Sequence, residues 1–253
     1  SKSDQVSKDT IEGGIVFQNV NFTYPGKNGP VFDNLNLKIN VGERIAIMGP
    51  VGSGKSTLIS LILGLNKPSS GYVLLDKVDV NSIRQDDLRN NIGVVLQNVE
   101  LFSGTLEDNI KINAEDVSND NFFAAARLSG VDDFAGQLQN AYKFHLQEGG
   151  LGLSGGQKQA IAWARALINQ PNLMILDEPT SAMDHETEAK ILNNLEEYFT
   201  GRTILFCTHR RSFIEKATRV IVLDDKGIKL DISAEEYLNK IASLDERQKI
   251  GQI

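Results

Sequence analysis

A glycine-rich segment that ends in a lysine and two hydroxyl residues is the first part of the chain whose residue types suggest chemistry. Residues 49–57 match the pattern G-x-x-x-x-G-K-[ST]. Glycines let successive backbone N–H groups wrap around phosphates, and the start of a following helix adds the positive end of its dipole. In such a loop Lys55 would reach the β and γ phosphates of a nucleotide, and Ser56 would bind Mg²⁺. The predicted phosphate ligands are Gly49, Pro50, Val51, Gly52, Ser53, Gly54, Lys55, Ser56 and Thr57.

Two adjacent carboxylates follow an apolar run. Asp177 and Glu178 come directly after Leu-Met-Ile-Leu at residues 173–176, so we expect both acids at the carboxyl edge of a sheet, where α/β proteins bind ligands. Asp177 would hold Mg²⁺ through water, and Glu178 would accept a proton from a water that attacks a γ-phosphate. The ordinary alternatives are that Asp177 caps the next turn and that Glu178 is simply solvated.

A histidine follows another apolar run. His209 comes after residues 203–208 and is expected at the same sheet edge. A ring nitrogen there would donate to a phosphate oxygen. His145 and His185 have no such position, and we interpret them as ordinary surface or core residues.

A second helix start is also suited to binding an anion. Residues 153–157 read Leu-Ser-Gly-Gly-Gln and precede a predicted helix with Ile161, Ala164, Leu167 and Ile168 on one face. Ser154 is placed as the N-cap, and its hydroxyl with the glycine N–H groups would form a second anion site. Two phosphate sites for one nucleotide suggest a dimer.

Short apolar runs predict the sheet that positions these groups. Residues 45–48, 173–176, 204–207 and 220–223 are continuously apolar, as expected of parallel strands covered on both faces by helices. Residues 14–24 and 31–40 are also strand-like, and polar residues alternate with apolar ones in the second stretch. That alternation favours an antiparallel strand with one wet face. The link at residues 25–30 is rich in turn residues and predicts a hairpin-like connection.

The remaining segments differ in pattern from the strands. Residues 106–142 carry helically spaced apolar residues, which predicts a mostly helical insertion. The first twelve residues are polar and read as a linker or tail, and residues 234–249 predict a terminal amphipathic helix. We therefore expect a linker at 1–12, one domain at 13–240 with a helical subdomain at about 100–165, and a C-terminal helix or tail at 241–253.

Composition restricts the class of protein further. The 253 residues include 26 basic and 33 acidic side chains, for a net charge of −7, and 41% of the residues are hydrophobic. This is typical of a soluble globular protein, and the lack of a basic tract argues against a nucleic-acid partner. No apolar run reaches the roughly 18 residues that a membrane span needs, and the start lacks a signal-peptide core. A single cysteine, Cys207, excludes an internal disulfide and a Cys-cluster metal site.

These motifs together resemble the nucleotide-binding domain of ATP-binding cassette (ABC) proteins, in the order typical of that family and from about Gly14 to Asn239. The resemblance implies the P-loop NTPase ABC ATPase fold of class α/β, with a mixed core sheet, an antiparallel N-terminal β-subdomain and a helical signature-motif subdomain. It implies ATP and Mg²⁺ as ligands, with Ser56, Gln97 and Asp177 around the metal.

The resemblance also implies roles for individual residues. Tyr24 would stack on adenine, Gln97 would sense Mg²⁺ and the lytic water at the junction with a membrane partner, and His209 would be the switch histidine. Residues 181–184 match the D-loop. Catalysis would involve Glu178, His209 and Gln97, and the signature of one copy would close over the nucleotide of the other. The signature residues are Ser154, Gly155, Gly156 and Gln157.

Two segments resemble the exporter branch of the family. Residues 97–110 look like the segment that receives the coupling helix of a membrane domain, and residues 148–152 resemble a loop that reports on the opposite membrane domain. Their combination with residues 153–157 and 180–184 is most similar to type I secretion ATPases, which export large proteins such as RTX toxins and adhesins. The chain departs from the family pattern at Ala160, often Arg, at Gln147, usually Gly, and at 230–233, which lack a common Gly.

These observations lead to an expectation for the whole machine. We expect an ATPase that forms a head-to-tail dimer with a second copy, attached to a transmembrane domain of the same parent polypeptide, with secretion accessory proteins as further partners. The chain would be the soluble motor portion of that membrane protein, at the cytoplasmic face of a bacterial inner membrane. The alternatives are a cassette that exports peptides, lipids or drugs, a soluble ABC ATPase of DNA repair or ribosomes, and a regulatory nucleotide-binding module.

Overall fold

The computed structural model describes residues 5–27, 29–112, 114, 117–225 and 227–250. Residues 1–4 of the predicted linker, Asn28 of the predicted turn, three residues of the predicted helical insertion, Lys226, and residues 251–253 of the predicted tail lie outside this set. The chain forms two compact units. Residues 14–82 and 204–253 are called the P-loop unit here, and residues 1–13 and 83–203 the signature unit.

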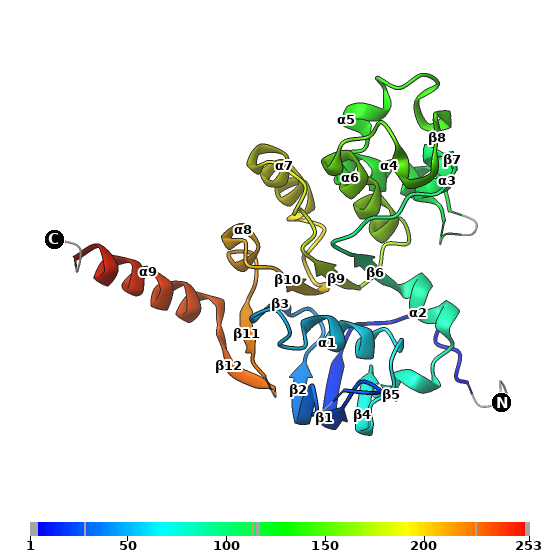
Figure 1. The fold of residues 1–253 in the computed structure, drawn as a ribbon. Coiled ribbons are helices and arrows are strands. Elements are labelled where there is room, and N and C mark those ends of the chain that lie inside the picture. Colours follow the sequence, from blue (N-terminus) through cyan, green and yellow to red (C-terminus); the bar gives the residue numbers. More distant parts are fainter. Residues whose placement is uncertain (1–4, 28, 113, 115–116, 226, 251–253) are drawn as a thin grey trace. The chain divides into compact units, whose positions relative to one another are not determined.

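The P-loop unit combines strands from both of its sequence segments (Figure 1). Its elements are β1 (Ile15–Phe22), β2 (Phe32–Ile39), β3 (Arg44–Met48), α1 (Lys55–Ile62), β4 (Ser70–Leu75), β5 (Val78–Asp79), the 3-10 turn η2 (Val80–Ser82), β10 (Thr203–Cys207), α8 (Arg211–Ile214), β11 (Arg219–Leu223), β12 (Ile228–Ser233) and α9 (Ala234–Ile250).

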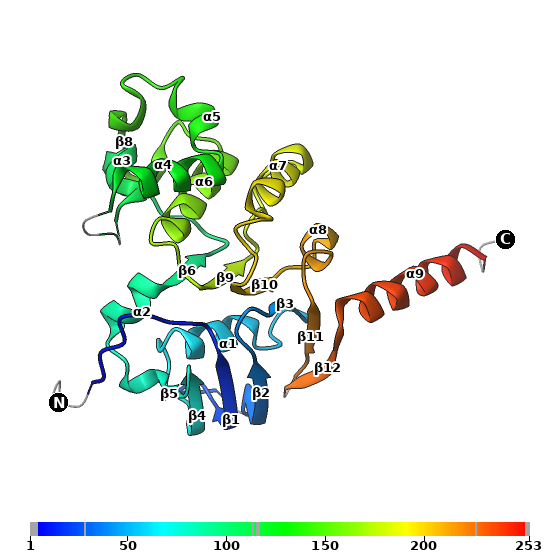
Figure 2. The ribbon, with the colours of Figure 1, turned by 180° about the vertical axis from the view of Figure 1, so that it is seen from behind.

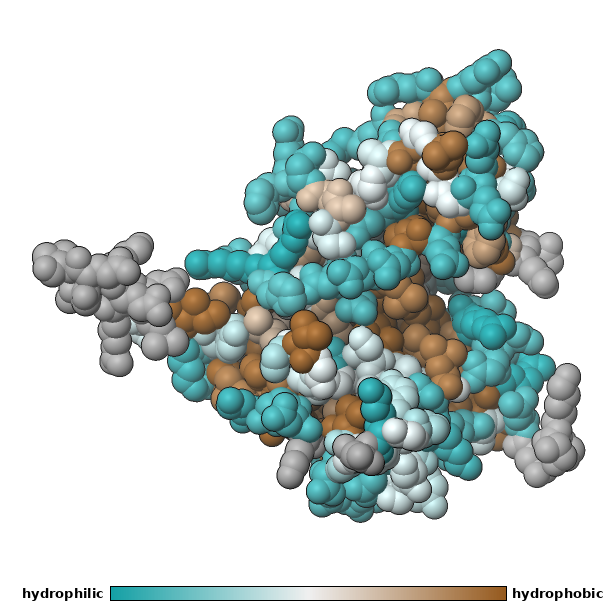
Figure 3. Space-filling model, in the orientation of Figure 1, coloured by the Kyte–Doolittle hydropathy of each residue, from teal (hydrophilic) through white to brown (hydrophobic). Residues whose placement is uncertain are grey.

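An antiparallel sheet with the strand order β2-β1-β4-β5 occupies the N-terminal part of this unit. In β2 the apolar residues Leu35, Leu37 and Ile39 are buried, and the polar residues between them are exposed. Figure 3 shows mainly hydrophilic side chains over this part of the molecule. The predicted antiparallel strand with one wet face is therefore present, whereas the pairing of β4 and β5 had no clear signal in the sequence.

The other strands of the P-loop unit form a second layer, in which β3, β10 and β11 are mostly buried and β12 is not. β3 runs parallel to β10 and to β11, and β12 pairs antiparallel with β11. Every residue of β10 is buried. The first turns of α9 pack on this layer, because Ala234 lies in one apolar cluster with Ala46 and Val220, and Tyr237 and Leu238 pack against it. The predicted terminal helix thus begins inside the core of the unit.

The signature unit is mostly helical and also contains one parallel strand pair (green and yellow in Figure 1). Its elements are α2 (Gln85–Asn91), β6 (Ile92–Val95), β7 (Gly104–Thr105), α3 (Leu106–Ile110), α4 (Asn119–Ser129), α5 (Asp132–Ala135), the 3-10 turns η3 (Ala141–Lys143) and η4 (Glu148–Gly150), β8 (His145–Leu146), α6 (Gly155–Leu167), β9 (Leu173–Asp177) and α7 (His185–Leu195).

Helix α6 is the central helix of the signature unit. It packs against α4, α3 and strand β6, and the views from both sides show it beside α4 (Figures 1 and 2). Trp163 on α6 is completely buried, as are Ala164 and Ile161. The apolar face predicted for this helix is therefore its packing face. In the part of the chain that the structure describes, no helix combines the length and apolar character needed to cross a bilayer.

The described part of the predicted linker packs against the rest of the signature unit. Val6 forms a parallel bridge with Ile83, and Ile11 is almost completely buried. The backbone N–H of Lys8 donates to the carboxylate of Asp87 at 2.9 Å. This stretch is therefore anchored at its middle and at its end, although its composition is that of a linker.

Asp87, at the start of α2, collects the anchoring bonds. Its carboxylate accepts from Ser7 Oγ at 3.2 Å, and from Nε and Nη2 of Arg84 at 3.1 and 2.8 Å. Arg84, with the hydrogen bonds from Lys8 and Ser7, lowers the pKa of Asp87 to about 2. The ionised carboxylate therefore holds the N-terminal segment in place.

The substitution Asp87→Asn tests this anchor. We expect it to lower the free energy of unfolding at neutral pH by about 1–2 kcal/mol, since bonds to a charged acceptor are lost and Arg84 is half exposed to screening water. The pKa is lower in the folded state, so the contribution is complete above about pH 4 and is lost as the pH falls towards 2. Urea unfolding at about pH 6 and about pH 3 should show the difference shrinking; an equal difference at both pH values would contradict this account.

Candidate nucleotide-binding site

The glycine-rich loop connects β3 to α1 in a conformation that glycine makes possible. Gly49, Gly52 and Gly54 all have positive φ angles, of 149°, 87° and 99°. A Cβ on Gly49 would lie 2.5 Å from the backbone oxygen of Leu223, and one on Gly54 would lie 2.9 Å from the Phe32 ring, whereas Gly52 faces open space. The loop thus needs glycine for its backbone at each position and for packing at two of them.

The inside of this loop offers groups that suit a phosphate. Lys55 folds back so that Nζ donates to the backbone oxygens of Gly49 and Pro50, at 2.5 and 3.0 Å. Ser53 Oγ is buried and has no hydrogen-bond partner among the described residues. A buried hydroxyl without a partner is costly, and a bound anion would supply its acceptor. The residues present therefore fit a nucleotide phosphate.

Tyr24 and His209 belong to the same unit as the loop. The hydroxyl of Tyr24 lies 3.1 Å from Oγ1 of Thr57, and its ring packs edge-to-face on Phe22 with centroids 4.8 Å apart. Tyr24 is therefore tied to the first turns of α1. Since Ile47 of β3 is paired with Cys207 of β10, Gly49 and His209 each lie two residues beyond that pair, at one carboxyl edge, and His209 is exposed.

Gln97, Asp177 and Glu178 lie at one sheet edge of the signature unit. Val95 of β6 is paired with Leu176 of the parallel strand β9, so Gln97 and Glu178 each lie two residues beyond this pair. Gln97 is exposed, and both carboxylates are half-buried. Glu178 has a φ of 44°, which is rare for a residue with a side chain and is typical of strained functional positions.

The predicted signature forms the start of α6. Ser154 is the N-cap: Oγ accepts from the N–H of Gln157 at 3.2 Å, and the N–H of Ser154 donates to Oε1 of Gln157 at 2.9 Å. This reciprocal pair is a capping box. The hydroxyl proton of Ser154 is not consumed by the cap, so it remains able to donate to a phosphate oxygen. Both Ser154 and Gly155 are exposed.

A family profile decides which class of protein these parts belong to. The profile of ABC transporters matches residues 32–181, a segment that contains the glycine-rich loop, Gln97, the signature and both carboxylates. The chain belongs to the ABC transporter family. The family implies ATP as the nucleotide, and the fold is that of the ABC ATPases.

Individual proteins of this family are similar over most of the chain. The alpha-hemolysin translocation ATP-binding protein HlyB of Escherichia coli O157:H7 is 41% identical over 92% of the chain, and the leukotoxin export ATP-binding protein LtxB of Aggregatibacter actinomycetemcomitans is 42% identical over 87%. The solved structure of a bacterial Atm1-family ABC exporter with ATP bound matches with a TM-score of 0.88 and 32% identity over 97% of the chain. The chain spans about a third of the two relatives, 33% and 31%, and 43% of the exporter.

The two segments that resemble exporters in sequence contact each other in this ABC protein. The N–H of Gly149 donates to the backbone oxygen of Leu101 at 2.8 Å. A Cβ on Gly150 would lie 2.5 Å from Cδ1 of Leu101, and Gly150 has a positive φ of 65°, so glycine is favoured at this position. Gln147, in place of the family's usual glycine, has an ordinary extended backbone. The loop before the signature is therefore packed on the segment after Gln97.

Asn109 and Arg165 shape that segment. The Asn109 side chain accepts from the backbone N–H of Phe102 at 2.9 Å and donates to the backbone oxygen of the same residue at 2.9 Å. Arg165 on α6 donates to the backbone oxygens of Glu100 and Asn109, at 2.7 and 2.6 Å. Burial lowers the pKa of Arg165 to about 10, so it remains charged at neutral pH. Phe102 stays half exposed on the surface of this segment.

Sequence reasoning missed two hydrogen-bonding side chains on the buried face of α6, those of Gln159 and Trp163. The side chain of Gln159 contacts the loop after Glu178, and Trp163 Nε1 donates to the backbone oxygen of Pro179 at 3.0 Å. A glutamine on the apolar face of a helix, one turn before a tryptophan, was the available signal. Ala160, the departure next to Gln159, is buried. The departure at 230–233 lies in β12, which pairs regularly with β11 there.

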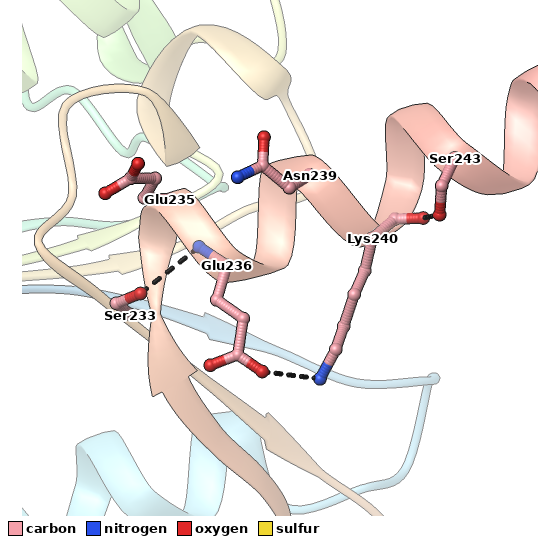
Figure 4. Close-up of a pocket in the computed structure, with 6 residues that line it drawn as sticks. All are labelled: Ser233, Glu235, Glu236, Asn239, Lys240 and Ser243. Carbon is pink, nitrogen blue, oxygen red and sulfur yellow. Dashed lines mark hydrogen bonds and ion pairs between the residues drawn. The ribbon is translucent and has the colours of Figure 1, made fainter.

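A separate pocket lies along α9 (Figure 4). It has a volume of about 420 Å³ and is lined by polar side chains, among which Glu236 and Lys240 form an ion pair at 2.8 Å. None of the predicted nucleotide ligands lines it.

Among the described residues, no group of three or more His, Cys, Asp or Glu side chains gathers around a metal position. Mg²⁺ beside a nucleotide needs only one or two protein ligands, with phosphates and water as the others.

Two alanine substitutions separate the reasons for glycine in the loop. Gly54→Ala adds a Cβ at a positive φ and against the Phe32 ring, whereas Gly52→Ala adds one at a similar φ with open space around it. We expect Gly54→Ala to lower the free energy of unfolding by about 1–3 kcal/mol more than Gly52→Ala does. Urea unfolding without nucleotide measures the difference, and equal stability of the two variants would show that Phe32 moves away freely.

Proposed function

We propose that this chain is the ATP-hydrolysing motor of a membrane exporter that performs type I secretion of a large protein. The arrangement of Gln97, Asp177 and Glu178 at one edge of the β6–β9 pair carries the proposed hydrolysis. The similarity to proteins named for hemolysin translocation and leukotoxin export supports the proposed direction and cargo. The buried Ser53 hydroxyl and the folded-back Lys55 support binding of the phosphates.

ATP would be bound by residues of several motifs. The loop at 49–57 holds the phosphates, Lys55 turns its ammonium to the β and γ phosphates, and Tyr24 stacks on the adenine. Ser56, Gln97 and Asp177 would hold Mg²⁺, which neutralises the charge that develops on the phosphates. Asp177 acts through water, as the acid at this position does in P-loop ATPases.

Catalysis would rest on positioning and charge. Glu178 accepts the proton of the attacking water, Gln97 orients that water, and His209 donates a hydrogen bond to the γ-phosphate. The signature residues at 154–157 of a second copy close the other side of the nucleotide. Each of two ATP molecules therefore lies between two chains in a head-to-tail dimer.

Hydrolysis would change the state of this dimer. One triphosphate that both chains bind is replaced by two products that repel each other, and the dimer loosens. A transmembrane domain of the same parent polypeptide then changes state, with secretion accessory proteins as further partners. The motor would work at the cytoplasmic face of a bacterial inner membrane.

The cargo is the part of this proposal with a specific competitor. An ABC transporter B family member of Arabidopsis thaliana is 36% identical over 93% of the chain, and the similar solved structure is that of an Atm1-family exporter. This favours, as the second candidate, a cassette that exports peptides, lipids or drugs. Both candidates share the ATPase chemistry and the exporter-type segment at 97–110.

The substitution Glu178→Gln tests the proposed chemistry. An amide keeps the shape of the side chain but cannot act as a base, so we expect the turnover rate to fall by about 10²–10⁴-fold while ATP still binds. The variant should accumulate as an ATP-bound dimer, seen by light scattering after gel filtration. Glu186→Gln, an exposed acid in the first turn of α7, is the matched control and should retain normal turnover. Undiminished turnover in Glu178→Gln would overturn the assignment.

The gene context tests the proposed cargo. We expect the coding sequence before Ser1 to encode six membrane-spanning helices, and a peptidase-like domain ahead of them would favour secretion of a protein or peptide. Purification of the full-length protein from membranes would then show ATPase activity that responds to the secreted protein. Membrane helices without such a domain, together with stimulation by lipids or small drugs, would favour the second candidate. A gene that encodes the cassette alone would contradict both.

A further inference from the structure

The buried side chain of Gln159 holds the loop that follows the proposed general base. Nε2 donates to the backbone oxygen of Glu178 at 3.3 Å and to Ser181 Oγ at 2.9 Å. Oε1 accepts from the N–H of Ala182 at 2.9 Å. Only 2% of the residue is exposed. One side chain on α6 therefore fixes both ends of the stretch 178–182.

The partners of Gln159 determine which way its amide faces. A backbone oxygen accepts only, so Glu178 requires the NH₂ group, and a backbone N–H donates only, so Ala182 requires the oxygen. Rotating the amide by half a turn would place two acceptors together and two donors together. The interaction is therefore directional, unlike the apolar packing that holds most of α6.

Glu178 is a position that needs such support. Its φ of 44° is costly for a residue with a side chain and persists only where the surroundings hold it. The Glu178 oxygen also accepts from the N–H of Ser181 at 3.2 Å, and the next residue, Pro179, accepts from Trp163 at 3.0 Å. Gln159 and Trp163, one helical turn apart, thus fix two consecutive peptide groups beside the carboxylate.

The signature forms the start of the same helix, one turn before Gln159. A Cβ on Gly155 would lie 2.9 Å from Cβ of Ala182, and one on Gly156 would lie 3.5 Å from its backbone oxygen. The signature glycines therefore rest on the residue whose N–H Gln159 binds. A displacement of the signature moves Ala182 directly, and Gln159 links Ala182 to Glu178.

We propose that Gln159 is a positioning residue that couples the seating of the signature to the alignment of the Glu178 carboxylate in the same chain. The proposal rests on the proposed function, in which Glu178 acts on ATP and the signature contacts the nucleotide of a second copy. When the signature is seated, Gln159 holds the backbone of Glu178 in its strained form. Gln159 itself touches neither nucleotide nor water in this role.

The substitution Gln159→Met tests the coupling in the chain as it stands. Methionine has a similar length but neither donates to Glu178 nor accepts from Ala182. We expect kcat for ATP to fall about tenfold, because the base is misaligned, while KM and the affinity of the nucleotide for the isolated chain change less than about twofold. Ile161→Val, a buried apolar residue on the same helix, is the control for lost stability and should leave kcat unchanged.

A double-mutant cycle separates positioning from a general loss of structure. Single-turnover hydrolysis is measured for Gln159→Met, for Glu178→Gln and for both together. Residues that act as a unit are strongly non-additive. We therefore expect Gln159→Met to reduce the residual rate of the Glu178→Gln variant less than about twofold. An equal tenfold loss in both backgrounds would overturn the proposal, since it would reveal a merely structural role.

Ser181→Ala keeps the test decisive if Gln159→Met does not fold. It removes one of the three bonds at an exposed position, and we expect a smaller fall in kcat with an unchanged KM. A normal kcat in both Gln159→Met and Ser181→Ala, with both variants folded, would overturn the coupling. The proposed function would still stand in that case, provided that the wild type hydrolyses ATP and Glu178→Gln does not. A wild-type chain that binds ATP but never hydrolyses it, alone or as a dimer, would overturn the proposed function and the coupling with it.

Discussion

Parallel pairing of short buried strands is the interaction that brings the candidate site residues of each unit together. β10 is buried at every residue, and it lies beside β3 in the P-loop unit as β6 lies beside β9 in the signature unit. Parallel strands end at the same edge, so a residue that follows one strand is brought beside a residue that follows its neighbour. A shift of the pairing register by one residue would turn every side chain of the strand to the opposite face. Because both faces are buried and closely packed, the neighbouring side chains do not fit such a shifted strand.

The sequence predicts those parts of the fold whose signal is local. Continuous apolar runs revealed β3, β9, β10 and β11, and alternation revealed β2, because burial on two faces or on one leaves its mark in each strand separately. β4 leaves little mark: it begins Ser70-Gly71-Tyr72, and Tyr72 is largely exposed. Pairing with β1 makes it a strand, and a Cβ on Gly71 would lie 2.2 Å from the oxygen of Asn19. That partner is distant in the sequence.

The candidate site also has parts that the local sequence predicts and parts that it does not. The glycines of the loop at 49–57, a carboxylate pair after a strand and an N-cap serine are contiguous patterns, since the chemistry predicted for each needs neighbouring residues. The supporting contacts are not contiguous. Gln159 reaches backbone groups 19 to 23 positions away, and Arg165 reaches 56 positions back to Asn109. Nothing in the local sequence names these partners, because any nearby backbone oxygen or N–H satisfies an amide or a guanidinium equally well.

Helix α6 shows why such directional contacts matter beside apolar packing. Apolar side chains such as those of Ile161 and Ala164 hold the helix in the core, but the hydrophobic effect that buries them has no preferred direction. Hydrogen bonds from Gln159 and Trp163 weaken steeply when their angles change, so they resist rotation and sliding of the helix. The helix start at Ser154 and the strained Glu178 are therefore held in one register by bonds worth only about 1 kcal/mol each, because Gln159 and Trp163 lie one turn apart on one helix and bond to consecutive peptide groups.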